Sequence, residues 1–186
     1  MYFRIRQVWR SLIDSNPHNG VLAAVTQLGE VLEIYNLKDS IHTVRIGPHG
    51  EPKFKVAEGY GIPTGIMGFC DVQVTDSAIY AVFQGRTFKE IAEAARRGDM
   101  TDGGRYVYVF SLMGETLRKY ELDHVIYGMF VDEQCRTIVA TDVNRDEPIS
   151  EYDMSRIKSG IRKVHIIDRI VYLKKYTMMT IYTCYS

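Results

Sequence analysis

The sequence predicts an all-β chain made of β-propeller blades, each a sheet of four antiparallel strands, with one short helical insertion. Three observations support this prediction. Three segments repeat the same order of strands and turns, aromatic residues are frequent at 13 Tyr and 7 Phe, and one stretch between two strands has the composition of a helix. A repeated order of short strands is expected of a propeller, and aromatic residues favour strands.

The first strand of each unit is apolar and is predicted to end at a turn that begins with Asp. These strands cover residues 12–16, 74–77 and 130–133. Asp14, Asp76 and Asp132 recur at intervals of roughly 60 residues, near the upper range for propeller repeats. An Asp side chain at a strand end can hydrogen-bond its own backbone and stabilise a tight turn.

The other strands of each unit follow in a fixed order. Ala23, Ala24, Ala81 and Ala140 lie in second strands at 21–25, 79–83 and 137–140. Small side chains suit a strand packed between neighbouring blades. Third strands, at 31–37, 106–112 and 149–154, have the two-residue period of a pleated strand in their clearest copy, 106–112. More polar fourth strands at 41–46 and 116–122 fit the exposed rim of a blade.

Four antiparallel strands per unit define a propeller blade. We therefore predict a partial propeller over residues 1–155, with blades at 1–50, 60–122 and 123–155. The alternative is an unrelated all-β sandwich whose strands are similar by chance. The agreement of the features in order as well as in type favours the blades.

One segment inside the middle unit is predicted to be a short helix. Residues 88–97 are good helix formers and are followed by Gly98. The segment lies between the second and third strands, so it should extend from one face or the rim of the propeller. Such a loop can carry a binding function, or it can be a surface decoration without one.

Composition excludes several classes of function. The 23 Lys and Arg balance the 23 Asp and Glu, and no basic block offers a footprint for nucleic acid. No window reaches the ~20 apolar residues of a membrane-spanning helix, and residues 1–6 lack the apolar core of a signal peptide. The cysteines, Cys70, Cys135 and Cys184, are far apart, so we interpret them as isolated buried thiols.

The sequence contains no recognisable catalytic set. It has no nucleophile elbow, phosphate-binding glycine loop, zinc-helix motif or calcium loop. The five His residues are scattered, and the Gly- and Pro-rich stretch 47–52, which contains His49 and Glu51, is interpreted as a connection between strands. We therefore predict no catalytic residue, no metal ligand and no cofactor.

Candidate ligand-binding residues come from position in the repeat. Trp9, Asp71 and Tyr127 each stand five residues before a turn Asp. In a propeller the innermost strand begins near the mouth of the central channel, so these side chains could converge there. Arg86, on the loop that carries the helix, is a further candidate. The alternative is that Trp9, Asp71 and Tyr127 pack only as structural residues.

Several of these stretches also resemble a known family. They are residues 68–76, 79–85, 107–110, 119–123 and 130–133. They are similar to the TolB-like six-bladed propeller-like proteins of Bacteroidetes, over residues 10 to 155. The resemblance implies a partial six-bladed propeller of about three blades, since complete members are about twice this length. It also implies a protein of the bacterial envelope, periplasmic or lipid-anchored, whose family has no generally assigned activity.

The C-terminal residues depart from the repeat. Residues 156–186 do not continue the pattern, and no Gly or Pro occurs from Arg162 to Ser186, which is unusual where hairpins are expected. We interpret this stretch as an atypical tail that belongs to none of the blades, produced by a truncated or out-of-frame coding end. An intact reading frame encoding only these residues would contradict that hypothesis.

The sequence thus favours a non-catalytic binding or interaction propeller of the bacterial cell envelope. Its partner would be an unidentified protein or small-molecule ligand. The alternative is a calcium-dependent six-bladed hydrolase or lactonase, which would need several inward carboxylate and amide ligands around one cation. Only Asp71 is placed for that role.

Overall fold

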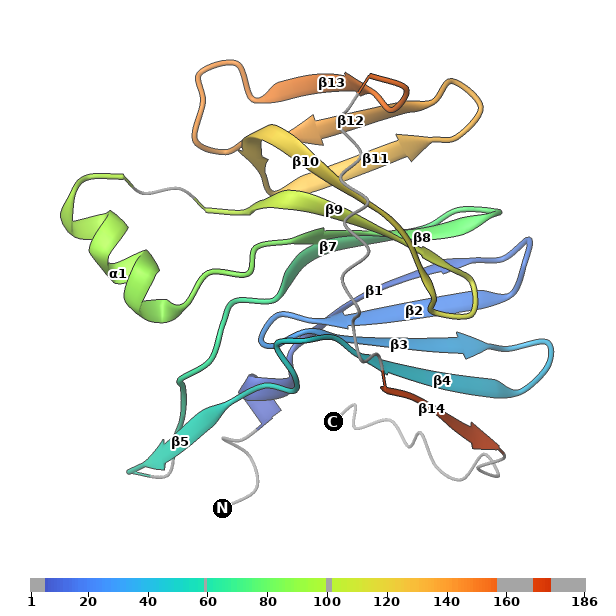
Figure 1. The fold of residues 1–186 in the computed structure, drawn as a ribbon, viewed down its shortest axis with the longest axis horizontal. Coiled ribbons are helices and arrows are strands. Elements are labelled where there is room, and N and C mark those ends of the chain that lie inside the picture. The colour runs from blue at the N-terminus through green and yellow to red at the C-terminus, as the bar shows by residue number, and fades with distance from the viewer. Residues whose placement is uncertain (1–5, 59, 100–101, 157–168, 175–186) are drawn as a thin grey trace, which may run out of the picture.

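The computed structural model of the chain describes residues 6–58, 60–99, 102–156 and 169–174. Its main strands form three antiparallel sheets stacked along the molecule, which confirms the predicted all-β class with propeller-like sheets (Figure 1). The first sheet contains β1 (Ser11–Asn16), β2 (Val21–Thr26), β3 (Val31–Asn36), β4 (Ile41–Ile46) and β14 (Arg169–Lys174). The second contains β7 (Phe69–Val74), β8 (Ala78–Phe83), β9 (Gly104–Ser111) and β10 (Thr116–Ile126). The third contains β11 (Gly128–Asp132), β12 (Thr137–Thr141) and β13 (Ile149–Asp153).

Two apolar cores hold the stack together, one at each junction between sheets. The first core joins side chains of the first and second sheets, and the second core joins those of the second and third sheets. Alternate residues of β8 supply both cores: Ile79 and Ala81 face the first sheet, and Tyr80 and Val82 face the third. The second sheet is therefore buried on both faces, as a blade between two others must be.

The strand register identifies corresponding places in the three sheets. Each second strand carries an aliphatic residue followed two positions later by Ala: Leu22 and Ala24, Ile79 and Ala81, Ile138 and Ala140. The aliphatic residues pair with aromatic residues of the third strands, Tyr35, Phe110 and Tyr152. Ala81 and Ala140 are completely buried against the preceding sheet. Ala24, whose sheet comes first, is only partly buried.

Polar side chains of the first strands cross from one sheet to the next. Asp14 Oδ2 of β1 accepts a hydrogen bond from the Val74 N–H of β7 at 2.7 Å. Asp71 Oδ2 of β7 accepts one from the Met129 N–H of β11 at 2.7 Å. Gln73 adds two further bonds, from the Val131 N–H at 2.7 Å and to the Val131 carbonyl at 3.2 Å. Each contact joins a side chain on the first strand of one sheet to a backbone group on the first strand of the next sheet, so these bonds tie neighbouring sheets together.

The predicted equivalence of Asp14, Asp76 and Asp132 at strand ends is wrong. Asp14 lies inside β1, and Asn16 begins the turn by accepting a hydrogen bond from the His18 N–H at 2.9 Å. Asp76 follows the end of β7, which covers residues 69–74 rather than 74–77. Only Asp132 ends its strand, and its Oδ1 accepts from the Cys135 N–H at 2.9 Å. Asn begins such turns as readily as Asp, so the position of Asp alone misplaced the repeat.

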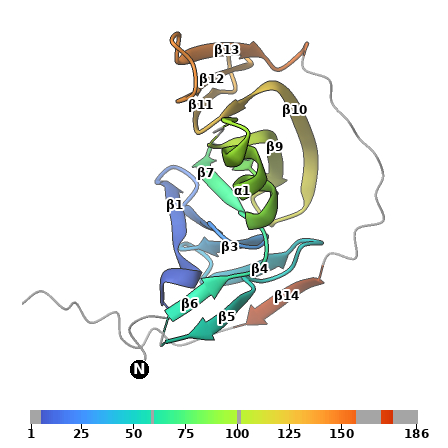
Figure 2. The same cartoon turned by 90° about the vertical axis from the view of Figure 1, so that its left-hand side faces the viewer.

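The predicted helix is confirmed as α1 (Phe88–Arg96), between β8 and β9. Thr87 and Glu90 form a capping box at its start, and Gly98 follows its end with a φ of +76°, a conformation that favours glycine. The helix lies beyond the strand ends of the second sheet (Figure 1), and Figure 2 views the molecule from that side.

Two further elements were not predicted. A hairpin of β5 (Phe54–Ala57) and β6 (Tyr60–Pro63) connects the first and second sheets. Its strands have four residues each and β6 ends in Pro, so the hairpin leaves only a weak strand pattern in the sequence. In the tail, β14 pairs with β4 from Arg169 opposite Ile46 to Lys174 opposite Ile41. Part of the predicted separate tail thus extends the first sheet, and 157–168 and 175–186 lie outside the described residues.

Candidate binding pocket between the second and third sheets

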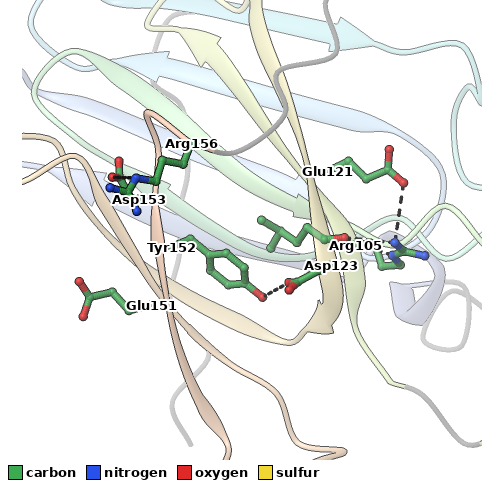
Figure 3. Close-up of a pocket in the computed structure, with 8 residues that line it drawn as sticks. Arg105, Glu121, Asp123, Glu151, Tyr152, Asp153 and Arg156 are labelled. Atoms are coloured by element: carbon green, nitrogen blue, oxygen red, sulfur yellow. Dashed lines mark hydrogen bonds and ion pairs between the residues drawn. The ribbon is translucent and has the colours of Figure 1, made fainter.

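A hollow of about 650 Å³ opens between the second and third sheets. Its walls come from β9 and β10 on one side and from β13 and the turn after it on the other (Figure 3). The lining residues are Arg105, Glu121, Leu122, Asp123, Glu151, Tyr152, Asp153 and Arg156. Four of these residues are acidic and two are arginines. Glu151 and Asp153 alternate with Tyr152 along β13, so their side chains lie on the other face of that strand.

Tyr152 and Asp123 form the central contact of this pocket. The Tyr152 hydroxyl donates a hydrogen bond to Asp123 Oδ1 at 3.1 Å, and His124 Nδ1 lies 3.1 Å from the same oxygen. Burial raises the pKa of the Tyr152 hydroxyl, and the hydrogen bond to the Asp123 carboxylate raises it further. The hydroxyl therefore keeps its proton at neutral pH and acts as a hydrogen-bond donor.

Two arginines complete the charged lining. Arg105 Nε and Nη2 both donate to the Leu122 carbonyl at 3.3 Å, and Arg105 Nη2 lies 3.8 Å from Glu121 Oε1. Arg156 Nε lies 3.4 Å from Asp153 Oδ2 (Figure 3). Fixed donors and acceptors in a concave site are suited to holding a polar ligand in one orientation.

Sequence reasoning missed this pocket. Asp123 stands at the predicted boundary between two blades, and Tyr152 lies in a predicted third strand. Asp123 also ends one of the stretches that resemble the family, but neither residue was assigned a role in binding. The pocket forms only when β10 and β13 come together, so the strand pattern of either segment alone contains no signal for it.

Asp71, the predicted channel-mouth residue, bridges two sheets. Besides its bond to Met129, its Oδ1 accepts from the Val72 N–H at 2.9 Å. Burial raises the pKa of the Asp71 carboxyl above its ordinary value of 3.8, and the two backbone N–H groups partly offset that rise. Both oxygens of Asp71 are thus engaged in joining strands of the stack.

The other three predicted ligand-binding residues, Trp9, Tyr127 and Arg86, lie in separate segments that connect strands or precede them. Trp9 ends a 3-10 helix (Arg6–Trp9) before β1, and Tyr127 directly precedes β11; each is 43% exposed. Arg86, between β8 and α1, is partly buried, and its carbonyl accepts from the Met67 N–H at 2.8 Å. Trp9 and Tyr127 are exposed enough to meet a ligand, whereas Asp71 lies inside β7.

A second charged cluster joins the first and second sheets. Arg45 is completely buried, its Nη2 donates to Thr116 Oγ1 at 2.9 Å, and its guanidinium lies 4.7 Å from the centre of the Phe110 ring. Lys119 Nζ lies 3.8 Å from the centre of the Tyr106 ring, and burial lowers its pKa. The Arg45 contacts cross from the first sheet to the second, whereas Lys119 and Tyr106 both belong to the second sheet. Cation–π contacts stabilise packed side chains, so this cluster has a structural role.

Metal-binding and membrane-spanning features were also sought within the described ranges. There, no group of three or more His, Cys, Asp or Glu side chains is placed to hold a metal ion. No helix in those ranges has the length and apolar character needed to cross a membrane.

Stacked antiparallel sheets joined by side chains of their first strands define a propeller-type protein. The sequence model of the family described as TolB-like 6-blade propeller-like matches residues 4–134, and the chain belongs to this family. No curated protein matches the chain.

Proposed function

We propose that the chain is a non-catalytic binding module of the bacterial cell envelope and that the blades at 1–50, 60–122 and 123–155 act as one unit. Membership of a propeller family favours a binding or interaction role. The single observation that carries the proposal is the pocket between the second and third sheets, where Arg105, Asp123 and Tyr152 present fixed donors and acceptors.

The chemistry of the pocket favours recognition over turnover. The Tyr152 hydroxyl is held protonated beside Asp123, and Arg105 is engaged by a backbone carbonyl. These groups suit a polar, uncharged or cationic small molecule. A second place for a ligand is the predicted channel mouth, where the exposure of Trp9 and Tyr127 supports stacking against a ligand. Arg86, on the loop before α1, is the weaker candidate there.

Thermal-shift measurements with a defined panel of sugars, amino acids, short peptides and polyamines test the binding role. A compound bound in the pocket should raise the Tm of the wild type and of Glu51→Gln, an exposed control between β4 and β5, far along the chain from the lining. The same compound should lose its effect on Asp123→Asn and on Arg105→Ala. An undiminished shift in both pocket variants would contradict this site and direct attention to Trp9 and Tyr127.

The calcium-dependent hydrolase is the competing function. It requires a hard cation held by several carboxylate or amide oxygens, whereas both oxygens of Asp71 accept backbone hydrogen bonds. We expect millimolar calcium to leave the Tm unchanged. Calcium-dependent stabilisation together with hydrolysis of a lactone would support the enzyme instead.

Fractionation of cells that encode the chain tests the envelope assignment, which predicts recovery with periplasm or membranes.

A further inference from the structure

The outer face of the first sheet is the face turned away from the second sheet. It carries the same kinds of residue that are buried at the equivalent positions of the second sheet. Leu22 and Ala24 point away from the second sheet and are partly exposed. Their counterparts Ile79 and Ala81 are completely buried because the first sheet covers them. Ile13, the β1 residue paired with Ala24, is 64% exposed.

The polar groups on this face are already partnered with one another. The Tyr35 hydroxyl donates to Glu33 Oε2 at 2.6 Å, and His42 Nε2 lies 3.0 Å from the same oxygen. The rings of Tyr35 and His42 stack with centroids 4.2 Å apart. A sheet that covered this face would therefore not leave Glu33 as an isolated buried charge, which would be the costly case.

The opposite end of the stack presents an exposed face on which two large apolar side chains lie beside the acidic residues Glu151 and Asp153 of β13. Phe130 of β11 is 61% exposed, and Ile149 of β13 is 69% exposed. Phe130 and Gln73 hold equivalent positions in the third and second sheets. Each stands one residue before the residue that pairs with the aliphatic residue of the second strand, Val131 opposite Ile138 and Val74 opposite Ile79. Phe130 thus occupies the place from which Gln73 reaches the next sheet, and it points away from the second sheet.

We propose that two copies of this chain close into one six-bladed ring, in which the third sheet of each copy covers the first sheet of the other. The family describes six blades, and the described residues form three stacked sheets. Three blades of a six-bladed ring span half a turn, so a two-fold axis along the centre of the ring generates the other three. Both exposed faces are then covered, and Phe130 of one copy lies near Ile13 of the other.

Light scattering coupled to size-exclusion chromatography tests the ring with the 186-residue chain. The wild type should have twice the 21.4 kDa mass of the chain. Ile13→Glu and Phe130→Glu act on opposite sides of the same contact, so each should weaken dimerisation about tenfold or more. Leu117→Glu is the matched control, because Leu117 is 47% exposed on β10 of the second sheet, outside the proposed contact. It should remain dimeric.

Circular dichroism confirms that each variant is folded before its mass is interpreted. Cysteines introduced together as Ile13→Cys and Phe130→Cys should join two copies under oxidation, whereas Leu117→Cys with Phe130→Cys should not. A monomeric wild type would overturn the proposal. So would a dimer that both glutamate variants leave intact, or an open series of larger assemblies in place of a closed pair.

Discussion

The second sheet and its two neighbours differ in burial although their central strands are similar in composition. Every residue of β8 is buried, whereas burial alternates along β2 and along β12. All three strands combine Ala with β-branched and aliphatic residues. The difference therefore comes from the neighbours of each sheet. A blade in this architecture is built to be covered twice, and a blade at either end of the stack keeps one such face exposed.

The largest effect should separate Ile79 from Leu22, which occupy corresponding places in β8 and β2. Ile79→Ala should lower the free energy of unfolding by about 2–5 kcal/mol, because it opens a cavity in a core covered from both sides. Leu22→Ala should cost about 1 kcal/mol or less, because Leu22 is already partly exposed. Urea unfolding measures both, at a chain concentration low enough to dissociate the proposed dimer. Equal losses would mean that the first sheet is covered on both faces in the single chain.

The sequence predicted the part of the fold that depends on local pattern. The strands at 41–46 and the helix at 88–97 were placed almost to the residue because alternation, helix propensity and Gly98 are local signals. The first strand of the second sheet was misplaced at 74–77 because Asp76, expected to end that strand, lies beyond the end of β7 (Phe69–Val74). The bridges formed by Asp71 and Gln73 depend on which sheets meet, and no signal along the strand reports that.

The candidate pocket lay beyond sequence reasoning for the same physical reason. Tyr152 and Asp123 are 29 positions apart and come together only through the stacking of the sheets. Trp9 and Tyr127 are exposed, but their predicted equivalence was counted from Asp14 and Asp132, which lie at different points of their strands. A repeat therefore indicates which positions correspond, whereas contacts between repeats require the structure.

The next largest effect should come from the bridge between the second and third sheets. Asp71→Ala leaves the Met129 N–H without its acceptor and should cost about 1–3 kcal/mol in unfolding free energy. The pKa of Asp71 is raised above 3.8 in the folded chain, so its carboxyl holds a proton more tightly when folded. The stability that this tighter proton binding adds is fully present below about pH 3.8 and is lost as the pH rises through the pKa of Asp71 in the folded chain.

Unfolding of the wild type and of Asp71→Ala at about pH 3 and about pH 7 measures this dependence. The difference between the two proteins should be larger at the acidic pH. Asp14→Ala is the matched variant for the first junction, where it removes the acceptor of the Val74 N–H. A difference that shrinks on acidification would show that burial of Asp71 does not govern its titration.

A smaller and more local effect is expected at the helical insertion. Thr87→Ala removes the acceptor of the Glu90 N–H, which is 3.1 Å from Thr87 Oγ1, and should destabilise α1 by about 1 kcal/mol. Amide exchange within the helix should quicken roughly fivefold. Exchange in β8 should not change. Ala94 is the one residue of α1 that is buried, so the helix contributes little to the packing around β8. Thr87→Ser keeps the hydroxyl and serves as the control. Faster exchange in β8 as well would mean that the helix supports the second sheet.

The smallest effect is one of reactivity and leaves stability unchanged. Burial raises the pKa of the Cys70 thiol to about 12, and Cys70 packs against the core between the second and third sheets. The predicted burial is wrong for Cys135, which is exposed in the turn after β11. Its hydrogen bond with Asp132 also raises the pKa of its thiol. Since the thiolate is the reactive form, iodoacetamide should modify Cys135 well before Cys70, as peptide mapping by mass spectrometry would record. If Cys70 reacts only when the stack opens, Ile79→Ala should accelerate its labelling and Leu22→Ala should barely change it. Labelling of Cys70 as fast as that of Cys135 in the wild type would mean that the junction between the second and third sheets opens readily in the native chain.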